Sequence, residues 1–392
     1  MPAKKRLVVC CDGTWNSADG AQEFTNVVRI ARAVRPYDAR VEPTIPQIVH
    51  YQAGVGTGGD AVQHFVGGAV GAGLSRNVRD AYAFVAHNYC EDDEVFLFGF
   101  SRGAYTARSV AGLIGYAGLL HKRDMDDFAL LWEGYRLKGE AGRPDVRARF
   151  PERHAAVPIR CIGVWDTVGA LGVPGHLGRL FTRFYEFHDT ELGAHVEHAF
   201  QALALDETRS DFEPAVWTQK PEGRANGQVL RQVWFPGVHS DVGGGYDEHG
   251  LSDVALAWMA GRVEPLLALD EGYFRLRQDR RAGWGLGRVH DSARGAWWFL
   301  GTEARRPFTK EPRAATFEGI HPSVGVRLAS AGGEREDHES PALSGIDLAG
   351  KLVALAPLEV RLRWSDADAA ASDRPERPSP SVLGRLLNDL GG

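Results

Sequence analysis

A serine between two glycines is the residue of this sequence best placed to do chemistry. Ser101 stands in Gly99-Phe100-Ser101-Arg102-Gly103, a G-x-S-x-G pattern that directly follows the apolar run EVFLF and directly precedes a helix-period segment. On such a strand-to-helix turn the backbone is strained, the serine Oγ is exposed, and the glycines allow close packing. The sequence therefore predicts a nucleophilic serine. The backbone N–H of Arg102, at the start of the helix, is a predicted donor to the developing oxyanion.

A nucleophilic serine needs a base, and the base needs a carboxylate that orients it. Asp166 ends the apolar run IRCIGVW, and His239 lies just beyond VLRQVWF. Because the carboxyl ends of parallel strands open onto one crevice, we expect both side chains beside Ser101. The order Ser, Asp, His is that of an α/β-hydrolase triad. His290 and His321 also lie downstream of Asp166 and are alternative bases, but neither directly follows a strong strand signal.

The first apolar run, RLVVCC, ends in a turn that would lie beside the turn of Ser101. The N–H of Gly13 or Thr14 is a candidate second oxyanion donor, and Asp12 is expected to orient this loop. The same stretch approaches D-x-D-G-T, the aspartyl-nucleophile motif of haloacid dehalogenase-like phosphatases. Cys10 occupies the position of the first aspartate, so no covalent phosphoryl intermediate could form there.

Two groups of polar residues have spacings that a metal site could use. His195 and His198 have i, i+3 spacing on an expected helix, but no third ligand stands out at suitable spacing. A second group, Asp241, His249 and Asp253, would suit calcium. The alternative, which we favour, is that the glycines beside Asp241 form a tight loop that lets the backbone approach substrate. We predict no metal site and no cofactor.

Five motifs together resemble a known family. CDGTWN, GFSRGAYTAR, WDTVGALG, ALALDETR and FPGVHSDVGGGY are similar to the uncharacterised α/β-hydrolase family that includes the catalytic domain of type VI secretion phospholipase effectors. The resemblance extends from about residue 5 to the segment IHPSVGVRL, which ends at residue 328. It implies an αβα sandwich, a triad carried by Ser101, Asp166 and His239, and hydrolysis of phospholipid acyl esters.

The elements that must position these residues are short apolar runs, each followed by a glycine turn and, in most cases, by a helix-period segment. This pattern predicts a parallel sheet covered by helices. Strands are expected at Arg6–Cys11, Glu94–Phe98, Ile159–Trp165 and Val229–Phe235, with a fifth candidate at Gln47–Tyr51. Helices are expected at Ser75–Tyr89, Tyr105–Tyr116 and Ser252–Val263. The predicted fold class is α/β, an α/β-hydrolase-like three-layer αβα sandwich with a mostly parallel sheet.

We expect a single hydrolase domain over residues 1–364. Two stretches near residues 119–149 and 272–312 suggest cap-like helical excursions over a pocket, and a satellite core is the alternative. Residues 365–392 are rich in Asp, Ala, Ser, Pro and Arg, a composition that cannot bury enough apolar surface to order itself. They predict a flexible C-terminal tail.

Composition and charge narrow the function classes. Of 392 residues, 45 are Lys or Arg and 51 are Asp or Glu, a net charge of -6 without long runs of one sign, which disfavours a nucleic-acid partner. The four cysteines show neither metal nor disulfide spacing, which is typical of a reducing compartment. The first apolar run is too short for a signal peptide, and no stretch approaches 18 apolar residues. We expect a cytoplasmically made, soluble protein, with signal-independent export and peripheral membrane contact left open.

The sequence therefore predicts a serine hydrolase that cleaves acyl esters through an acyl-enzyme, of the esterase, lipase or phospholipase type. Its substrate would be a small-molecule or lipid ester. Acyl transfer or thioester hydrolysis on the same triad is an alternative, and so is a non-catalytic hydrolase-like scaffold that binds a partner.

Overall fold

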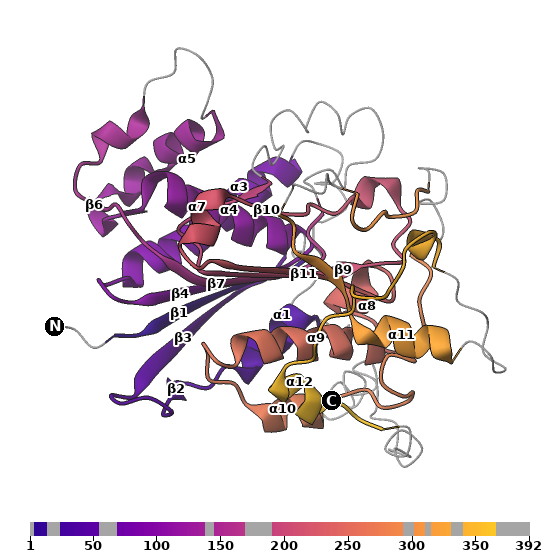
Figure 1. Ribbon diagram of the computed structural model, residues 1–392. Coiled ribbons are helices and arrows are strands. Elements are labelled where there is room, and N and C mark those ends of the chain that lie inside the picture. The colour runs from indigo at the N-terminus through magenta and orange to yellow at the C-terminus, as the bar shows by residue number, and fades with distance from the viewer. Residues whose placement is uncertain are drawn as a thin grey trace, which may run out of the picture.

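An eight-stranded sheet forms the centre of the computed structural model. The residues described are 4–13, 24–54, 69–137, 145–168, 190–292, 302–309, 315–330 and 340–365. The strands follow the order β12-β11-β9-β7-β4-β1-β3-β2 (Figure 1). All neighbours pair in parallel except β2, which is antiparallel to β3. The bounds are β1 Arg6–Cys11, β2 Tyr37–Asp38, β3 Ile45–Gln52, β4 Glu94–Phe100, β7 Ile159–Trp165, β9 His198–Ala204, β11 Val229–Phe235 and β12 Glu318–Ile320.

Helices cover both faces of the sheet (Figure 1). One face carries α3 (Ala69–Asn88) and α4 (Arg102–Ala117), and the other carries α1 (Asn26–Ala33) and α9 (Gly250–Val263). In β1, Leu7 and Val9 join the core under α3 and α4, whereas Val8 and Cys10 join the core under α1 and α9. Because both faces are buried, the strands are continuous apolar runs instead of alternating ones. The predicted three-layer α/β class with a mostly parallel sheet is confirmed.

Shorter elements complete the described chain. Two minor sheets pair β5 (Leu119–Leu120) with β6 (Arg153–His154) and β8 (Glu191–Leu192) with β10 (Thr218–Gln219). The remaining helices are α5 Phe128–Arg136, α7 Pro221–Ala225, α8 His239–Gly243, α10 Glu271–Leu276, α11 Pro322–Ala329 and α12 Pro357–Leu362.

One element differs from the sequence expectation. The segment with His195 and His198 is not a helix: His195 lies in a turn, and His198 begins β9, between β7 and β11. The run HAFQALA is rich in alanine, which favours a helix in isolation. Burial between two parallel strands overrides that local preference.

The two stretches expected as excursions have different surroundings. From the first, Phe128, Leu131 and Trp132 join the core beneath α3 and α4, while residues 138–144 lie outside the described chain. The described parts of the second stretch are residues 272–292 and 302–309. They include Ser292 and Arg305, which contact residues at the carboxyl edge of the sheet. Residues 293–301, 310–312 and 366–392, which hold the rest of this stretch and most of the expected tail, also lie outside the described chain. A cap role and a flexible tail stay predictions.

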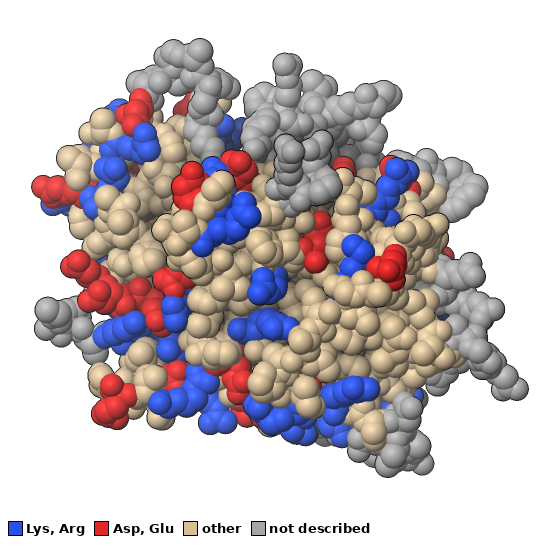
Figure 2. Space-filling view, viewed as in Figure 1, with Lys and Arg blue, Asp and Glu red and all other residues tan. Residues whose placement is uncertain are grey.

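Acidic and basic side chains are interspersed over the face shown in Figure 2. Among the described helices, none combines the length and the apolar character needed to span a bilayer.

Candidate functional site

Five polar residues follow the carboxyl ends of five adjacent strands. In sheet order they are His239 after β11, Glu207 after β9, Asp166 after β7, Ser101 after β4 and Asp12 after β1. Parallel strands end at the same edge of a sheet, so the fold brings these residues to one edge of the sheet.

Ser101 occupies a strained turn between β4 and α4. Its backbone has φ 56° and ψ −123°, and its N–H donates to the carbonyl oxygen of Trp165 at the end of β7 (3.2 Å). A Cβ on Gly99 would lie 2.5 Å from the carbonyl oxygen of Gly103, and a Cβ on Gly103 would overlap backbone atoms of β1 and Asp12. Both glycines of the motif are therefore required sterically. Arg102 begins α4, where the first N–H groups of a helix have no partner within it.

Asp166 and His239 form a buried pair. Asp166 is fully buried, and its Oδ2 lies 2.5 Å from Nδ1 of His239. The imidazole packs against Phe100, the residue before Ser101 (4.6 Å between ring centroids), and edge-on against Phe212 (5.0 Å). With Nδ1 directed at the carboxylate, Nε2 is the ring nitrogen left for other chemistry.

Arg305 was not anticipated from the sequence. Its Nη1 donates to Asp166 Oδ1 (2.6 Å) and its Nη2 to Oδ2 (3.0 Å), while the carbonyl oxygens of Ala204 and Phe212 accept further bonds. Burial alone would raise the pKa of Asp166, but the Arg305 charge and the hydrogen bond with His239 hold it well below its usual range. No local pattern could have indicated an arginine 139 residues away along the chain.

Asp12 lies buried at the end of β1, and its expected role in orienting the following loop stays a prediction, because residues 14–23 lie outside the described chain. Its carboxylate accepts from the hydroxyls of Thr25 (2.8 Å) and Tyr51 (2.7 Å) and from the Gly13 N–H (2.7 Å). Burial raises its pKa to about 6 despite these three bonds. The Gly13 N–H is thus engaged by Asp12 and would have to leave it to reach an oxyanion, while Thr14 lies outside the described residues.

Two further residues from the stretch 272–292 reach this region. Ser292 donates to Glu207 Oε1 (2.9 Å), and Glu207 in turn accepts from the backbone N–H of His239 (3.2 Å). His290 pairs with Asp241, its Nδ1 being 2.6 Å from Oδ1. His290, an alternative base, thus has a carboxylate of its own and does not share Asp166.

His321, the other alternative base, is fully buried. Its ring nitrogens contact Ser323 Oγ (2.7 Å) and Glu359 Oε1 (2.6 Å), and its ring stacks on Phe235. A group enclosed in this way is part of the core, because substrate cannot reach it.

The residues weighed as metal ligands have other partners. Asp253 pairs with Arg29 and with His249, and Asp241 pairs with His290. Within the described ranges, no three or more His, Cys, Asp or Glu side chains gather where they could hold an ion.

Comparison with known proteins gives relatives of low identity. An uncharacterized protein of Saccharomyces cerevisiae, YEL023C, is 28% identical over 240 residues, which is 55% of this chain and 33% of that protein. Among solved structures, the Tle1 effector bound to the VgrG spike of the type 6 secretion system is 20% identical (TM-score 0.34), covering 63% of this chain and 52% of that one. An uncharacterized Pseudomonas aeruginosa protein is 18% identical (TM-score 0.35), covering 66% and 45%.

This chain therefore spans about a third to a half of the length of these relatives. A family model matches residues 5–262, a range that includes Ser101, Asp166 and His239. Its description is "T6SS, Phospholipase effector Tle1-like, catalytic domain", and the chain belongs to this family.

Proposed function

We propose that this chain is a serine ester hydrolase of the lipase or phospholipase type, built on an α/β-hydrolase-like core. One observation carries the proposal: the strained turn of Ser101 follows β4, and the neighbouring strand β7 is followed by Asp166, the partner of His239. Membership of a phospholipase effector family supports an acyl ester as substrate.

In the proposed mechanism Ser101 Oγ attacks the acyl carbonyl carbon while His239 Nε2 accepts the hydroxyl proton. Asp166 holds the imidazole through Nδ1 and stabilises its cation. The N–H of Arg102 donates to the tetrahedral oxyanion. Collapse of this intermediate releases the alcohol with the proton held by His239, and water activated by the same imidazole then cleaves the acyl-enzyme.

Replacing the nucleophile tests the proposal directly. Ser101→Ala is expected to lower kcat on p-nitrophenyl esters by about a thousandfold or more, since oxyanion binding alone leaves only residual catalysis. A fluorophosphonate probe should label the wild type and fail to label the variant. A variant that keeps a tenth of wild-type activity would rule Ser101 out as nucleophile.

The two histidine–aspartate pairs, His239 with Asp166 and His290 with Asp241, provide a matched comparison. His239→Ala should cost nearly as much as Ser101→Ala, and the double variant should lose little more, because triad members act as a unit. His290→Ala, which breaks the pair with Asp241, should retain most activity. The opposite pattern would show that the base is His290 even if Ser101 is the nucleophile.

A further inference from the structure

The turn that carries His239 is fastened by three carboxylates. The backbone N–H groups of three successive residues each donate to a different one: Gly237 to Asp206 Oδ2 (2.6 Å), Val238 to Asp241 Oδ2 (3.0 Å) and His239 to Glu207 Oε2 (3.2 Å). The N–H of Asp206 also donates to the carbonyl oxygen of Gly237 (3.0 Å). Two consecutive acidic residues after β9 therefore hold the backbone that leads to the candidate base.

Glu207 is the one of these carboxylates whose charge is coupled to that of His239. Its side chain is fully buried, pairs with Arg209 (2.8 Å) and accepts from the Ser292 hydroxyl (2.9 Å). Burial alone would raise its pKa, but the hydrogen bond and charge of Arg209, together with the charge of His239, lower it to about 2. Glu207 is therefore an anion at neutral pH. Because such coupling is reciprocal, its charge favours the protonated imidazole.

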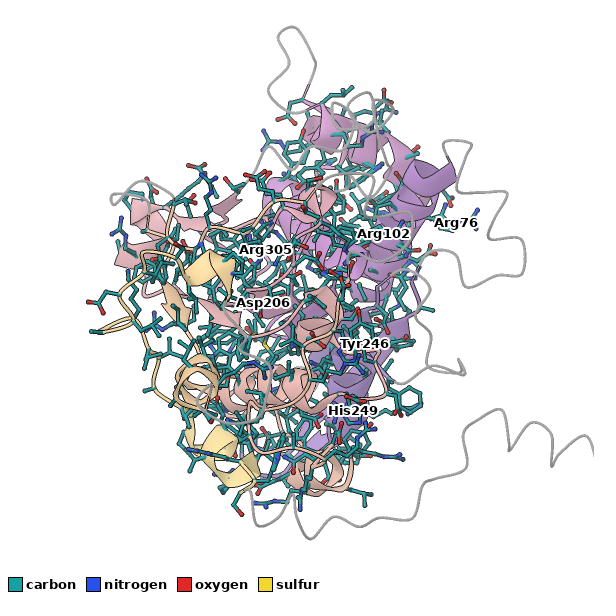
Figure 3. The ribbon with its side chains drawn as sticks, turned by 90° about the vertical axis from the view of Figure 1, so that its right-hand side faces the viewer. Arg76, Arg102, Asp206, Tyr246, His249 and Arg305 are labelled. Carbon is teal, nitrogen blue, oxygen red and sulfur yellow. The ribbon has the colours of Figure 1, made fainter. Side chains whose placement is uncertain are left out.

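The charged groups around the imidazole come from several elements. They are Asp166 with Arg305 after β7, Glu207 with Arg209 after β9, and Asp241 with His290 beside α8 itself. The Arg209 guanidinium lies 3.5 Å from the centre of the Phe212 ring, which contacts the imidazole edge-on. In Figure 3, Asp206 and Arg305 lie in the same region of the view. Two buried carboxylate–arginine pairs thus adjoin His239.

A second anion beside His239 has a physical reason. His239 is the first residue of α8, and the partial positive charge of a helix amino end opposes an imidazolium there. Asp166 contacts Nδ1, but its negative charge is shared with Arg305. Glu207 lies on the backbone side of the same residue and adds to the stabilisation of the cation.

We propose that Glu207 is a positioning residue for the base: it fixes the backbone of His239 and favours the protonated imidazole that forms when Ser101 attacks. Asp166 orients the ring through Nδ1, and Glu207 acts from the opposite end of the residue. This inference rests on the proposed serine hydrolase function and adds a second carboxylate to its base.

The test follows the protonation of His239 directly. In protein labelled with ¹³C at histidine Cε1, the NMR signal of His239 is identified by its absence from His239→Ala. Glu207→Gln keeps the shape of the side chain and removes its charge, so the titration midpoint of that signal should move lower by about one pH unit. The rising limb of kcat/KM on a p-nitrophenyl ester should move in the same direction. The plateau of kcat/KM should fall by about tenfold, because the imidazolium loses stabilisation.

Two variants separate charge from structure. Glu207→Asp keeps the charge and should titrate close to the wild type, even though its shorter side chain lowers the rate. Glu94→Gln removes a glutamate that pairs with Arg6 at the amino end of β4, on the opposite edge of the sheet, and should leave the midpoint unchanged.

A double variant covers the possibility that an unpaired Arg209 prevents folding. Glu207→Gln/Arg209→Gln has no unpaired charge, and its midpoint should still move lower, because Glu207 bonds to His239 whereas Arg209 reaches it through Phe212. Wild-type midpoints in every variant without the Glu207 charge would overturn the inference. A Glu207→Asp midpoint that moves as far as that of Glu207→Gln would overturn it too.

The NMR titration needs no catalysis, so this inference and the proposed function fail separately. Unchanged midpoints with Ser101 still labelled by the fluorophosphonate probe would overturn the role of Glu207 and leave the nucleophile in place. Hydrolysis that persists in Ser101→Ala would contradict the nucleophile, while a lowered midpoint in Glu207→Gln would still support the coupling of Glu207 with His239.

Discussion

Asp166 contacts two basic side chains at once. Its carboxylate lies 2.5 Å from Nδ1 of His239 and forms an ion pair with Arg305. Its carboxylate also accepts the backbone N–H of Ala204 (2.9 Å). A fully buried carboxylate would resist ionisation, and a protonated one could not stabilise an imidazolium cation. We therefore propose that Arg305 is a positioning residue, which keeps Asp166 charged and fixed in orientation.

Replacing Arg305 should show this role. In Arg305→Met the burial of Asp166 is no longer compensated, so its pKa should rise and activity should fall further as the pH is lowered. Loss of a buried partner also destabilises a protein by about 3–5 kcal/mol, so the pH profile of kcat/KM is the deciding readout. Added guanidinium should restore part of the activity at concentrations that leave the fold intact, and Arg305→Lys should show a smaller defect. A wild-type pH profile without rescue would indicate a purely structural arginine.

The raised pKa of Asp12 predicts that the protein loses stability as the pH rises, whereas the activity defect of Arg305→Met grows as the pH falls. Its pKa is raised from 3.8 to about 6, so between these values the folded state binds more protons than the unfolded state. Its contribution to the unfolding free energy therefore falls as the pH rises through this window, by about 3 kcal/mol at most. Asp12→Asn should remove that fall.

Urea unfolding of wild type and Asp12→Asn at pH 4 and pH 7 would measure this effect. Groups with lowered pKa values, such as Asp38 and Asp166, are present in both proteins, so the difference between the two isolates Asp12. Equal pH dependence of the two proteins would contradict the raised pKa.

At the scale of elements, the turn from β4 to α4 fits closely against β1 only because residue 103 is a glycine. A Cβ on Gly103 would meet the carbonyl oxygens of Cys11 and Asp12, which are backbone atoms that cannot rotate away. Gly103→Ala should therefore destabilise the protein by about 1–3 kcal/mol or more and impair activity, since the Asp12 loop must move.

Gly325 in α11 is the matched control for this substitution. A Cβ there would have Leu352 Cδ1 as its nearest neighbour, at 3.9 Å. Because alanine is the better helix former, Gly325→Ala should be neutral or stabilising by up to about 1 kcal/mol. The urea midpoints of Gly103→Ala and Gly325→Ala measure this difference in stability. Similar midpoints would mean that the Ser101 turn can move away from β1 at little cost.

The same elements explain what the sequence could predict. Runs rich in Val, Ile and Phe between glycine turns marked β1, β4, β7 and β11 correctly, and the residues after them include those that gather at the sheet edge. The strand β9 carries no such signal, because its alanines specify a strand only through their neighbours. Arg305 is similar: its role depends on a contact that folding creates and that no local spacing encodes.

At the scale of the whole molecule, the family match ends at residue 262, but the fold does not. Beyond it, β12 extends the sheet beside β11, α12 packs against α9, and Arg305 reaches Asp166. The core under α1 and α9 likewise includes Trp284, Leu358, Leu362 and Trp364. The C-terminal part of the described chain therefore completes both the core and the candidate site.

Trp364 gives the sharpest test of that dependence. It is 3% exposed, stands edge-on to Trp284 (4.7 Å between ring centroids) and donates its Nε1–H to the carbonyl oxygen of Ala282 (2.7 Å). Trp364→Ala should lower the unfolding free energy by about 3–5 kcal/mol, because it leaves a large cavity and an unpaired carbonyl. Val360→Ala is the control, since Val360 is 55% exposed and its truncation should change stability by less than about 0.5 kcal/mol. Urea unfolding followed by tryptophan fluorescence and by circular dichroism should give one shared transition in each protein. If Trp364→Ala unfolded in two steps, with hydrolysis surviving the first, the segment beyond residue 262 would be an appendage and not part of one cooperative core.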